Sequence, residues 1–118
     1  MKVQDKNIVV TGAASGIGKA LAKVFSKHNA KSIVLVDIDE DALIASATEV
    51  NGLAIVADIS NEESILEIIN KANDHMESID IFCSNAGIGG APGLINTTDD
   101  DWQKIWQVNV MSHIYAAK

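Results

Sequence analysis

The chain has 118 residues, of which nine are Lys, none is Arg and 16 are Asp or Glu, so its formal net charge is −7. This composition excludes a clustered basic surface that neutralises phosphates, and we expect no nucleic-acid partner. No apolar run reaches the roughly 18 residues that cross a membrane, and a single Cys excludes an internal disulfide or a multi-cysteine metal site. We therefore expect a cytoplasmic protein without a signal peptide, a membrane partner or a bound metal.

Four short apolar segments follow one another along the chain and have the composition of β-strands. They are Ile8–Thr11, Ile33–Asp37, Leu53–Asp58 and Ile79–Ser84. Three of the four are nearly continuous hydrophobic runs. Such runs are typical of strands that helices cover on both faces.

Longer stretches with helical spacing lie between and after these strands. Their apolar positions are Ile17, Leu21, Val24 and Phe25 in the first, an Ala-rich segment over residues 40–50 in the second, and Ile65, Leu66, Ile68 and Ile69 in the third. Ser60 with Glu63 has the spacing of a capping box and predicts the start of the third helix. Thr98, which three aspartates follow, predicts the start of a fourth helix, because acidic side chains suit the positive end of the helix dipole.

The order of these segments is β-α-β-α-β-α-β-α. Strands that alternate with helices imply right-handed crossovers and a parallel sheet, so we expect an α/β fold and one domain over residues 1–118. The longest irregular segment, Ala86–Asn96, follows the fourth strand. In an open α/β sheet, ligands bind at the loops that follow the carboxyl ends of the strands, so we expect this loop to border the site.

A glycine-rich turn, TGAASGIG over Thr11–Gly18, joins the first strand to the first helix. Gly12 permits a tight turn, Gly16 lets the backbone approach a pyrophosphate, and Gly18 allows the helix to pack closely on the sheet. The free N–H groups at the helix start would receive the phosphates. A chain without Arg can hold a dinucleotide in this way.

Two other interpretations of the turn are weaker. A P-loop would need one residue fewer before Gly18 and a Ser or Thr in place of Ala20 to hold Mg²⁺. A glycine turn without any ligand is the other alternative. The strand–turn–helix setting favours nucleotide binding, since an acid also ends the next strand.

That acid is Asp37, which ends the second strand. A carboxylate there can accept hydrogen bonds from the hydroxyls of an adenine ribose and would repel a 2′-phosphate. Its neighbour Ile38, and Ser15 in the turn, offer no cation for such a phosphate. The sequence therefore predicts NAD rather than NADP as the cofactor.

The motifs in this order resemble the classical short-chain dehydrogenase/reductase family. The resemblance rests on Thr11–Gly18 as T-G-x-x-x-G-x-G, Asp37, Asp58-Ile59, Asn85-Ala86-Gly87, and Trp102 with Val108-Asn109-Val110. It implies a Rossmann-type doubly wound parallel sheet, of which the chain holds the N-terminal half. The cofactor-binding residues that it implies, with those read from the turn, are Gly12, Ser15, Gly16, Ile17, Gly18, Asp37, Ile38, Asp58, Ile59, Asn85, Ala86 and Gly87.

The resemblance also implies a catalytic residue. Asn109 would be the Asn of the family's catalytic tetrad, in a locally distorted helix, whereas the Ser, Tyr and Lys of the tetrad do not occur in these residues. Tyr115 and Lys118 are three residues apart, not four, and lie in the same helix as Asn109, so we assign them to helix packing and solvent. We expect a fragment that ends before the catalytic Tyr and Lys.

The remaining residues of interest have structural interpretations. Cys83 lies in an apolar strand and is expected in the core. The three histidines are scattered without the spacing of a metal site. Trp102 and Trp106 share a helix face and are expected in the core or in a subunit contact.

Two functions follow from these observations. In the first, the parent protein is an NAD-dependent oxidoreductase that moves a hydride between nicotinamide and a small alcohol or ketone, and it is a homo-oligomer by resemblance, a dimer or tetramer. In the second, the 118 residues are the complete chain and form a nucleotide-binding or interaction module without catalysis. We favour the first for the parent protein and expect the 118-residue chain alone to be inactive.

Overall fold

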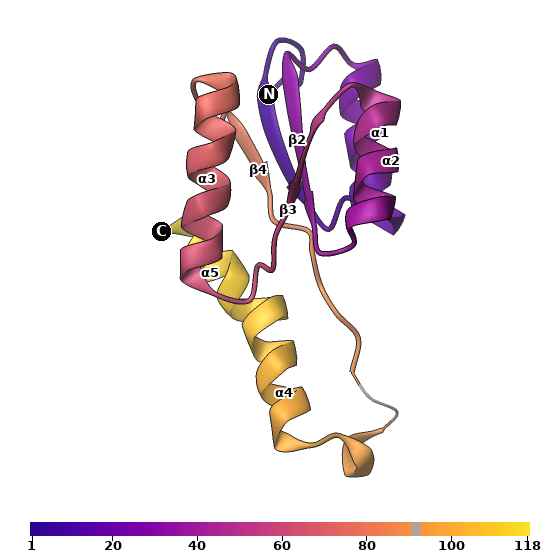
Figure 1. Cartoon of the computed structure of the whole chain (residues 1–118), viewed down its shortest axis with the longest axis vertical. Helices are drawn as coiled ribbons and strands as arrows, with labels where there is room; N and C mark the ends of the chain where they lie inside the picture. Colours follow the sequence, from indigo (N-terminus) through magenta and orange to yellow (C-terminus); the bar gives the residue numbers. More distant parts are fainter. Residues whose placement is uncertain (91–92) are drawn as a thin grey trace.

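The computed structural model describes residues 1–90 and 93–118. Its sheet has four strands in the order β3-β2-β1-β4, and all the pairings are parallel (Figure 1). The strands are β1 (Asn7–Thr11), β2 (Ser32–Asp37), β3 (Leu53–Val56) and β4 (Ile81–Cys83). Val9 of β1 stands in register with Val34 of β2 on one side and Phe82 of β4 on the other. The expected parallel α/β fold is confirmed, although β3 and β4 are shorter than the sequence predicts.

Helices cover both faces of this sheet. They are α1 (Gly16–Lys27), α2 (Glu40–Val50), α3 (Glu62–Met76), α4 (Asp99–Trp106) and α5 (Ser112–Ala117), with a 3₁₀ turn η1 (Leu94–Asn96) before α4 and a π-helical turn η2 (Gln107–Met111) between α4 and α5. α1 and α2 lie on one face, and α3 and α5 lie on the other (Figure 1). α4 extends away from the sheet, beyond the carboxyl ends of the strands (Figure 1).

The core consists of two apolar layers, one on each face of the sheet. Ile8 and Val10 of β1 pack with the residues of α1 and α2, whereas Val9 between them packs with those of α3. All three are fully buried. The continuous apolar run of β1 is explained in this way, because successive side chains of a strand enter opposite layers.

The helix starts agree with the sequence in one case and differ in another. Thr98 caps α4 as expected, in a capping box with Asp101. The expected capping box of Ser60 with Glu63 is wrong, because Asn61 caps α3 and its Oδ1 accepts a hydrogen bond from the Ser64 N–H at 2.9 Å. Asn and Ser are almost equally good at this position, and the two stand next to each other in the sequence.

Some of the apolar residues that mark the helices by their spacing are exposed. Ile17 is 73% exposed, Val24 47% and Leu66 56%. Trp102 and Trp106 are also exposed, at 46% and 56%, so neither lies in the core. Helical spacing alone therefore overestimates the buried face of three helices.

Three residues whose side chains could be reactive, Cys83, Tyr115 and Lys118, make structural contacts instead. Cys83 packs partly buried against the layer under α1 and α2, and burial raises the pKa of its thiol. Tyr115 packs against the layer under α3, and Lys118 pairs with Glu62 at the exposed start of α3. These contacts agree with the assignment of Tyr115 and Lys118 to packing and solvent.

Two further searches cover the described residues only. None of their helices is long and apolar enough to cross a membrane. Residues 1–90 and 93–118 also contain no group of three or more His, Cys, Asp or Glu side chains that could hold a metal ion. Within the loop Ala86–Asn96, which the sequence places at the border of the site, Ala91 and Pro92 lie outside the described residues.

Candidate functional site

The glycine turn between β1 and α1 has two kinds of glycine. A Cβ at Gly12 would lie 2.8 Å from the Ala86 Cα, and a Cβ at Gly18 would overlap the carbonyl oxygen of Gly12. A Cβ at Gly16 would meet no heavy atom within 4 Å. Gly12 and Gly16 have φ angles of +68° and +53°, where a side chain is strained. Gly12 and Gly18 thus allow close packing, whereas Gly16 keeps the space in front of the helix open.

The N-terminus of α1 is left without a protein cap. Ser15 is the N-cap residue, but among the described residues its side chain makes no capping hydrogen bond, and the first turn contains no acidic residue. The first N–H groups of a helix have no partner within the helix, and they lie at the positive end of its dipole. This end of α1 can therefore receive an anion.

Thr11 joins the glycine turn to the segment after β4. Its hydroxyl oxygen accepts hydrogen bonds from the Asn85 N–H at 3.0 Å and the Ala86 N–H at 3.1 Å. The Asn85 side-chain amide donates in return to the Thr11 carbonyl oxygen at 3.1 Å. The two loops therefore hold each other at the carboxyl ends of β1 and β4.

Asp37 is fixed at the end of β2 by three backbone N–H groups. Its Oδ2 accepts from the Ala14 N–H at 3.0 Å, and its Oδ1 accepts from Ile38 at 2.7 Å and Asp39 at 3.2 Å. The bond to Ala14 ties the carboxylate to the glycine turn. Its remaining lone pairs are free to accept hydrogen bonds from a ligand's hydroxyl groups.

Asp58 and Ile59 follow β3 at the same edge of the sheet. Asp58 Oδ1 accepts a hydrogen bond from the Ser60 N–H at 2.9 Å, which orients the carboxylate. Ile59 is buried in the layer under α3. The pair therefore presents one polar and one apolar side chain next to each other.

Asn109 lies in the π-helical turn η2 and binds the loop after β4. Its Oδ1 accepts from the Ile88 N–H at 2.8 Å, and its amide donates to the Ile88 carbonyl oxygen at 2.9 Å. A π-helical turn inside an α-helix is rare and is frequent at functional sites. The distorted helix that the resemblance implies around Asn109 is thus present.

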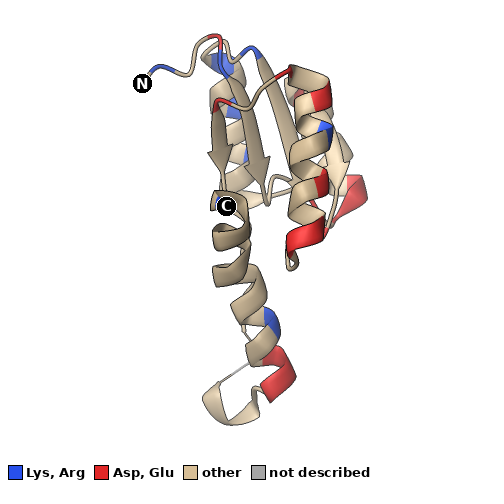
Figure 2. Ribbon diagram, turned by 90° about the vertical axis from the view of Figure 1, so that its left-hand side faces the viewer, with Lys and Arg blue, Asp and Glu red and all other residues tan. Residues whose placement is uncertain are grey.

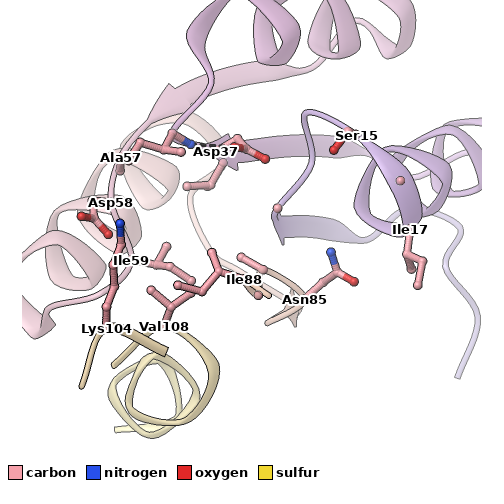
Figure 3. Close-up of a pocket in the computed structure, with 16 residues that line it drawn as sticks. Ser15, Ile17, Asp37, Ala57, Asp58, Ile59, Asn85, Ile88, Lys104 and Val108 are labelled. Carbon is pink, nitrogen blue, oxygen red and sulfur yellow. Dashed lines mark hydrogen bonds between the residues drawn. The ribbon is translucent and has the colours of Figure 1, made fainter. Parts of the chain in front are cut away.

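These loops and strand ends surround one cleft of about 530 Å³ (Figure 3). It is lined by Gly12, Ser15, Gly16, Ile17, Val36, Asp37, Ile38, Ala57, Asp58, Ile59, Asn85, Ala86, Gly87, Ile88, Lys104 and Val108. Ser15 and Ile17 lie at one end of the cleft, and Asp58, Ile59 and Lys104 at the other (Figure 3). A molecule in this cleft would touch the helix start at one end and an apolar wall with two charges at the other.

The cleft brings together the cofactor-binding residues expected from the sequence, with one exception. Gly18 does not line the cleft but lies beneath it, against the Gly12 carbonyl. Asn109 does not line the cleft either and reaches it through Ile88.

Sequence reasoning missed several residues that line the cleft. They are Val36, Ala57, Ile88, Lys104 and Val108. Val36 and Ala57 directly precede Asp37 and Asp58, so their place next to these two acids could have suggested them. Lys104 and Val108 are four residues apart and share a helix face, but only the fold shows that this face borders the cleft.

The model of the short chain dehydrogenase family matches residues 6–118. The chain belongs to this family. A curated relative, 1-deoxy-11-beta-hydroxypentalenate dehydrogenase from Streptomyces exfoliatus, is 34% identical over the whole chain and 45% of its own length. The chain thus belongs to a family of oxidoreductases.

Solved structures of short-chain dehydrogenases have the same fold. One from Burkholderia phymatum in complex with NAD has a TM-score of 0.93 and 26% identity, over 99% of this chain and 43% of that one. Another from Burkholderia cenocepacia in complex with NADP has a TM-score of 0.92 and 27% identity, over 99% of this chain and 50% of that one. The chain spans about half the length of the relatives that it matches.

Proposed function

We propose that this chain is the cofactor-binding half of an NAD-dependent short-chain dehydrogenase, whose whole protein transfers a hydride between nicotinamide and an alcohol or ketone. The observation that carries the proposal is Asp37. Its carboxylate lines the cleft at the end of β2 and is bound to the glycine turn through Ala14. An acid in this place suits the hydroxyls of an adenine ribose.

The chain's own residues fit a dinucleotide. At Gly16 no heavy atom lies within 4 Å of a Cβ position, so the backbone leaves room where a pyrophosphate would lie. Ser15 and Ile17 flank this space. The N–H groups of this turn would hold the phosphates without any Arg.

The rest of the cleft divides into a ribose part and a base part. Asp37 would bind the ribose, and Ile38, Asp58 and Ile59 would enclose the base, the last by apolar contact. Asn85, Ala86 and Gly87 would support the nicotinamide side. When bound, NAD supplies the carbon that accepts or donates the hydride.

Asn109 is proposed as the chain's contribution to the catalytic set. Both ends of its side-chain amide are bound to the Ile88 backbone, so the side chain holds the loop after β4 against the π-helical turn. This contact would fix the loop that borders the reacting end of the cofactor. The Ser, Tyr and Lys of the set would come from the rest of the parent protein, and the 118 residues alone are proposed to be inactive.

The choice of NAD over NADP is tested by replacing Asp37. Wild type is expected to bind NAD more tightly than NADP, since Asp37 accepts hydrogen bonds from the ribose and repels a 2′-phosphate. Asp37→Ala should narrow the preference by about tenfold, because hydrogen bonds to a charged group are worth about 1.5–3 kcal/mol. Titration with both nucleotides measures the ratio.

The matched control for this test is Asp41→Ala, an exposed acid in the first turn of α2 that does not line the cleft. It removes the same charge nearby and should leave the preference as in wild type. An unchanged preference in Asp37→Ala would remove Asp37 from this role.

The whole protein's activity has a separate test. Sequence downstream of Lys118 should contain a Ser and a Tyr-x-x-x-Lys motif, and the whole protein should reduce NAD with a small alcohol. If the motif is missing, the alternative of a nucleotide-binding module without catalysis replaces the proposal. A cytoplasmic location and a homo-oligomeric state complete the proposal, the first from the cysteine content and the second from the family resemblance.

A further inference from the structure

The end of the cleft opposite the glycine turn contains a cation that the proposed function does not use. Of the described residues that line the cleft, Lys104 is the only one with a positive side chain. It comes from α4, whereas Asp58 and Ile59 come from the loop after β3. In Figure 3 the Lys104 side chain extends from α4 toward Asp58 and lies far from Ser15 and Ile17.

Lys104 is not engaged elsewhere by an ion pair. The ion pairs within 4.0 Å among residues 1–90 and 93–118 involve other lysines: Lys6, Lys19, Lys23 and Lys118. The pKa of Asp101, one turn earlier on α4, is lowered mainly by its hydrogen bonds with Thr98, and the charge of Lys104 contributes less. The ammonium is therefore available to a partner across the cleft.

Asp58 is the complementary partner. Its Oδ1 is bound to the Ser60 N–H, and its Oδ2 has no hydrogen bond among the described residues. The walls beside these two charges are apolar, with Ile59 and Val108 buried and Ile38 exposed at 69%. We call the space between Ile38, Ile59 and Val108 the apolar slot. A flat ring would fit this slot, with the charges of Asp58 and Lys104 at its edge.

We infer that Lys104 is a positioning residue for the nucleobase of the dinucleotide, an inference that rests on the proposed function. With the base in the slot, the alkyl stem of Lys104 covers the outer edge of the ring, and the ammonium pairs with Asp58 across it. Lysine is suited to this arrangement because its stem is apolar while its charge stays in water. The base is then held on its open side, which lowers the rate at which the dinucleotide leaves.

The test compares Lys104→Met, which keeps the stem length but removes the charge, with Lys104→Arg, which keeps both. NADH binding is followed by energy transfer from Trp102 and Trp106, and AMP is then used to displace NADH. Lys104→Met should weaken the binding of both ligands by about threefold, the size of one exposed charge interaction. Lys104→Arg should bind them as wild type does.

Lys27→Met is the matched control, because Lys27 is an exposed lysine in the last turn of α1 and does not line the cleft. It makes the same change of net charge and should leave both affinities unchanged. If Lys104→Met behaves like Lys27→Met, or if Lys27→Met loses as much as Lys104→Met does, the inference is overturned.

A double-mutant cycle tests whether Lys104 acts through a pair with Asp58. In an Asp58→Asn background, Lys104→Met should cause no further loss, because the partner of its charge is already gone. Independent, multiplicative losses would show that Lys104 and Asp58 do not interact and would overturn the inference. Wild type that binds no NADH would overturn the proposed function as well, whereas normal wild-type binding with an unaffected Lys104→Met overturns this inference alone.

Discussion

The chain begins α1 and α4 in opposite ways. At α4, Thr98 and Asp101 bind each other's backbone N–H groups, and the first turn contains three aspartates. At α1, the N-cap residue Ser15 makes no capping hydrogen bond among the described residues, and the first turn has no acid. In Figure 2 the ribbon at the free end of α4 is red, the colour of Asp and Glu. The start of α4 is capped by its own residues, whereas the start of α1 leaves its N–H groups open to an anion.

The difference supports the proposal that the start of α1 binds the phosphates of the cofactor. α2 and α3 are also capped by side chains, those of Asp39 and Asn61. Ser is as good a cap as Asn or Asp, so residue type does not explain the exception at α1. An uncapped start costs stability, and natural proteins break such local rules mainly at functional sites.

The largest expected effect comes from adding a methyl group to a glycine of the turn before α1. In Gly18→Ala the new Cβ overlaps the Gly12 carbonyl, so the turn must move, and we expect a loss of about 3 kcal/mol in the free energy of unfolding. Gly16→Ala meets no atom but has the strained φ, and should cost about 1 kcal/mol. Urea unfolding measures both.

Gly16→Ala should affect NAD binding more than stability. Gly16→Ala places a methyl group in the cleft and should abolish detectable NAD binding although the protein still folds. Equal stability of the two variants would show that the distinction between a packing glycine and an open glycine is wrong.

The next effect comes from giving α1 the charge that α4 already has. Ile17 lies in the first turn of α1, is 73% exposed and lines the cleft. Ile17→Glu should leave stability unchanged or raise it slightly, because an acid suits the positive end of the dipole. It should also weaken NAD binding by about tenfold through repulsion of the phosphates.

Ile17→Gln is the control for this substitution, since it has the same size without the charge. Its affinity for NAD should lie near that of wild type in isothermal titration. A Glu variant that binds NAD as well as the Gln variant would refute the proposal that the start of α1 receives an anion.

A smaller effect is expected from removing the two N-cap side chains. Thr98→Ala should cost about 1 kcal/mol in the free energy of unfolding, because it removes a cap that accepts from the Asp101 N–H at 3.2 Å. Ser15→Ala should cost less than about 0.5 kcal/mol, since no cap is lost. Thr98→Ser keeps the hydroxyl and should be close to wild type. Equal losses in the two Ala variants would mean that Ser15 caps α1 in solution.

Much of this fold could be predicted from local sequence because its signals are local. Continuous apolar runs mark β1 and β2, because the side chains of each strand pack into the core layers on both faces of the sheet. Thr98 and its aspartates mark α4, because the whole capping box lies within four residues. The glycine turn is likewise read from its spacing and its place between a strand and a helix.

The parts that the sequence did not predict depend on long-range packing. Ile17 has the spacing of a buried residue but borders the cleft, so an apolar side chain there is exposed. Lys104 belongs to no motif, and its place in the lining of the cleft depends on the angle at which α4 leaves the sheet. Asn61 rather than Ser60 caps α3, and the sequence alone does not decide between two adjacent residues that are both good N-caps.

The smallest expected effect is the pH dependence of stability that Asp101 causes at the capped start of α4. The hydrogen bonds from the Thr98 hydroxyl and N–H, in that order, lower the pKa of Asp101 below its ordinary value of 3.8. A carboxyl with a lowered pKa binds its proton more weakly in the folded state, so its contribution to stability is present above pH 3.8 and is lost as the pH falls through the lower folded value. Asp101→Asn should abolish this part of the acid destabilisation in pH-dependent urea unfolding, whereas Asp100→Asn, which removes a charge from the same turn without touching Thr98, should retain it. Identical acid profiles for wild type and Asp101→Asn would mean that the α4 capping box is not formed in solution, and the contrast with α1 would then fail at its satisfied end.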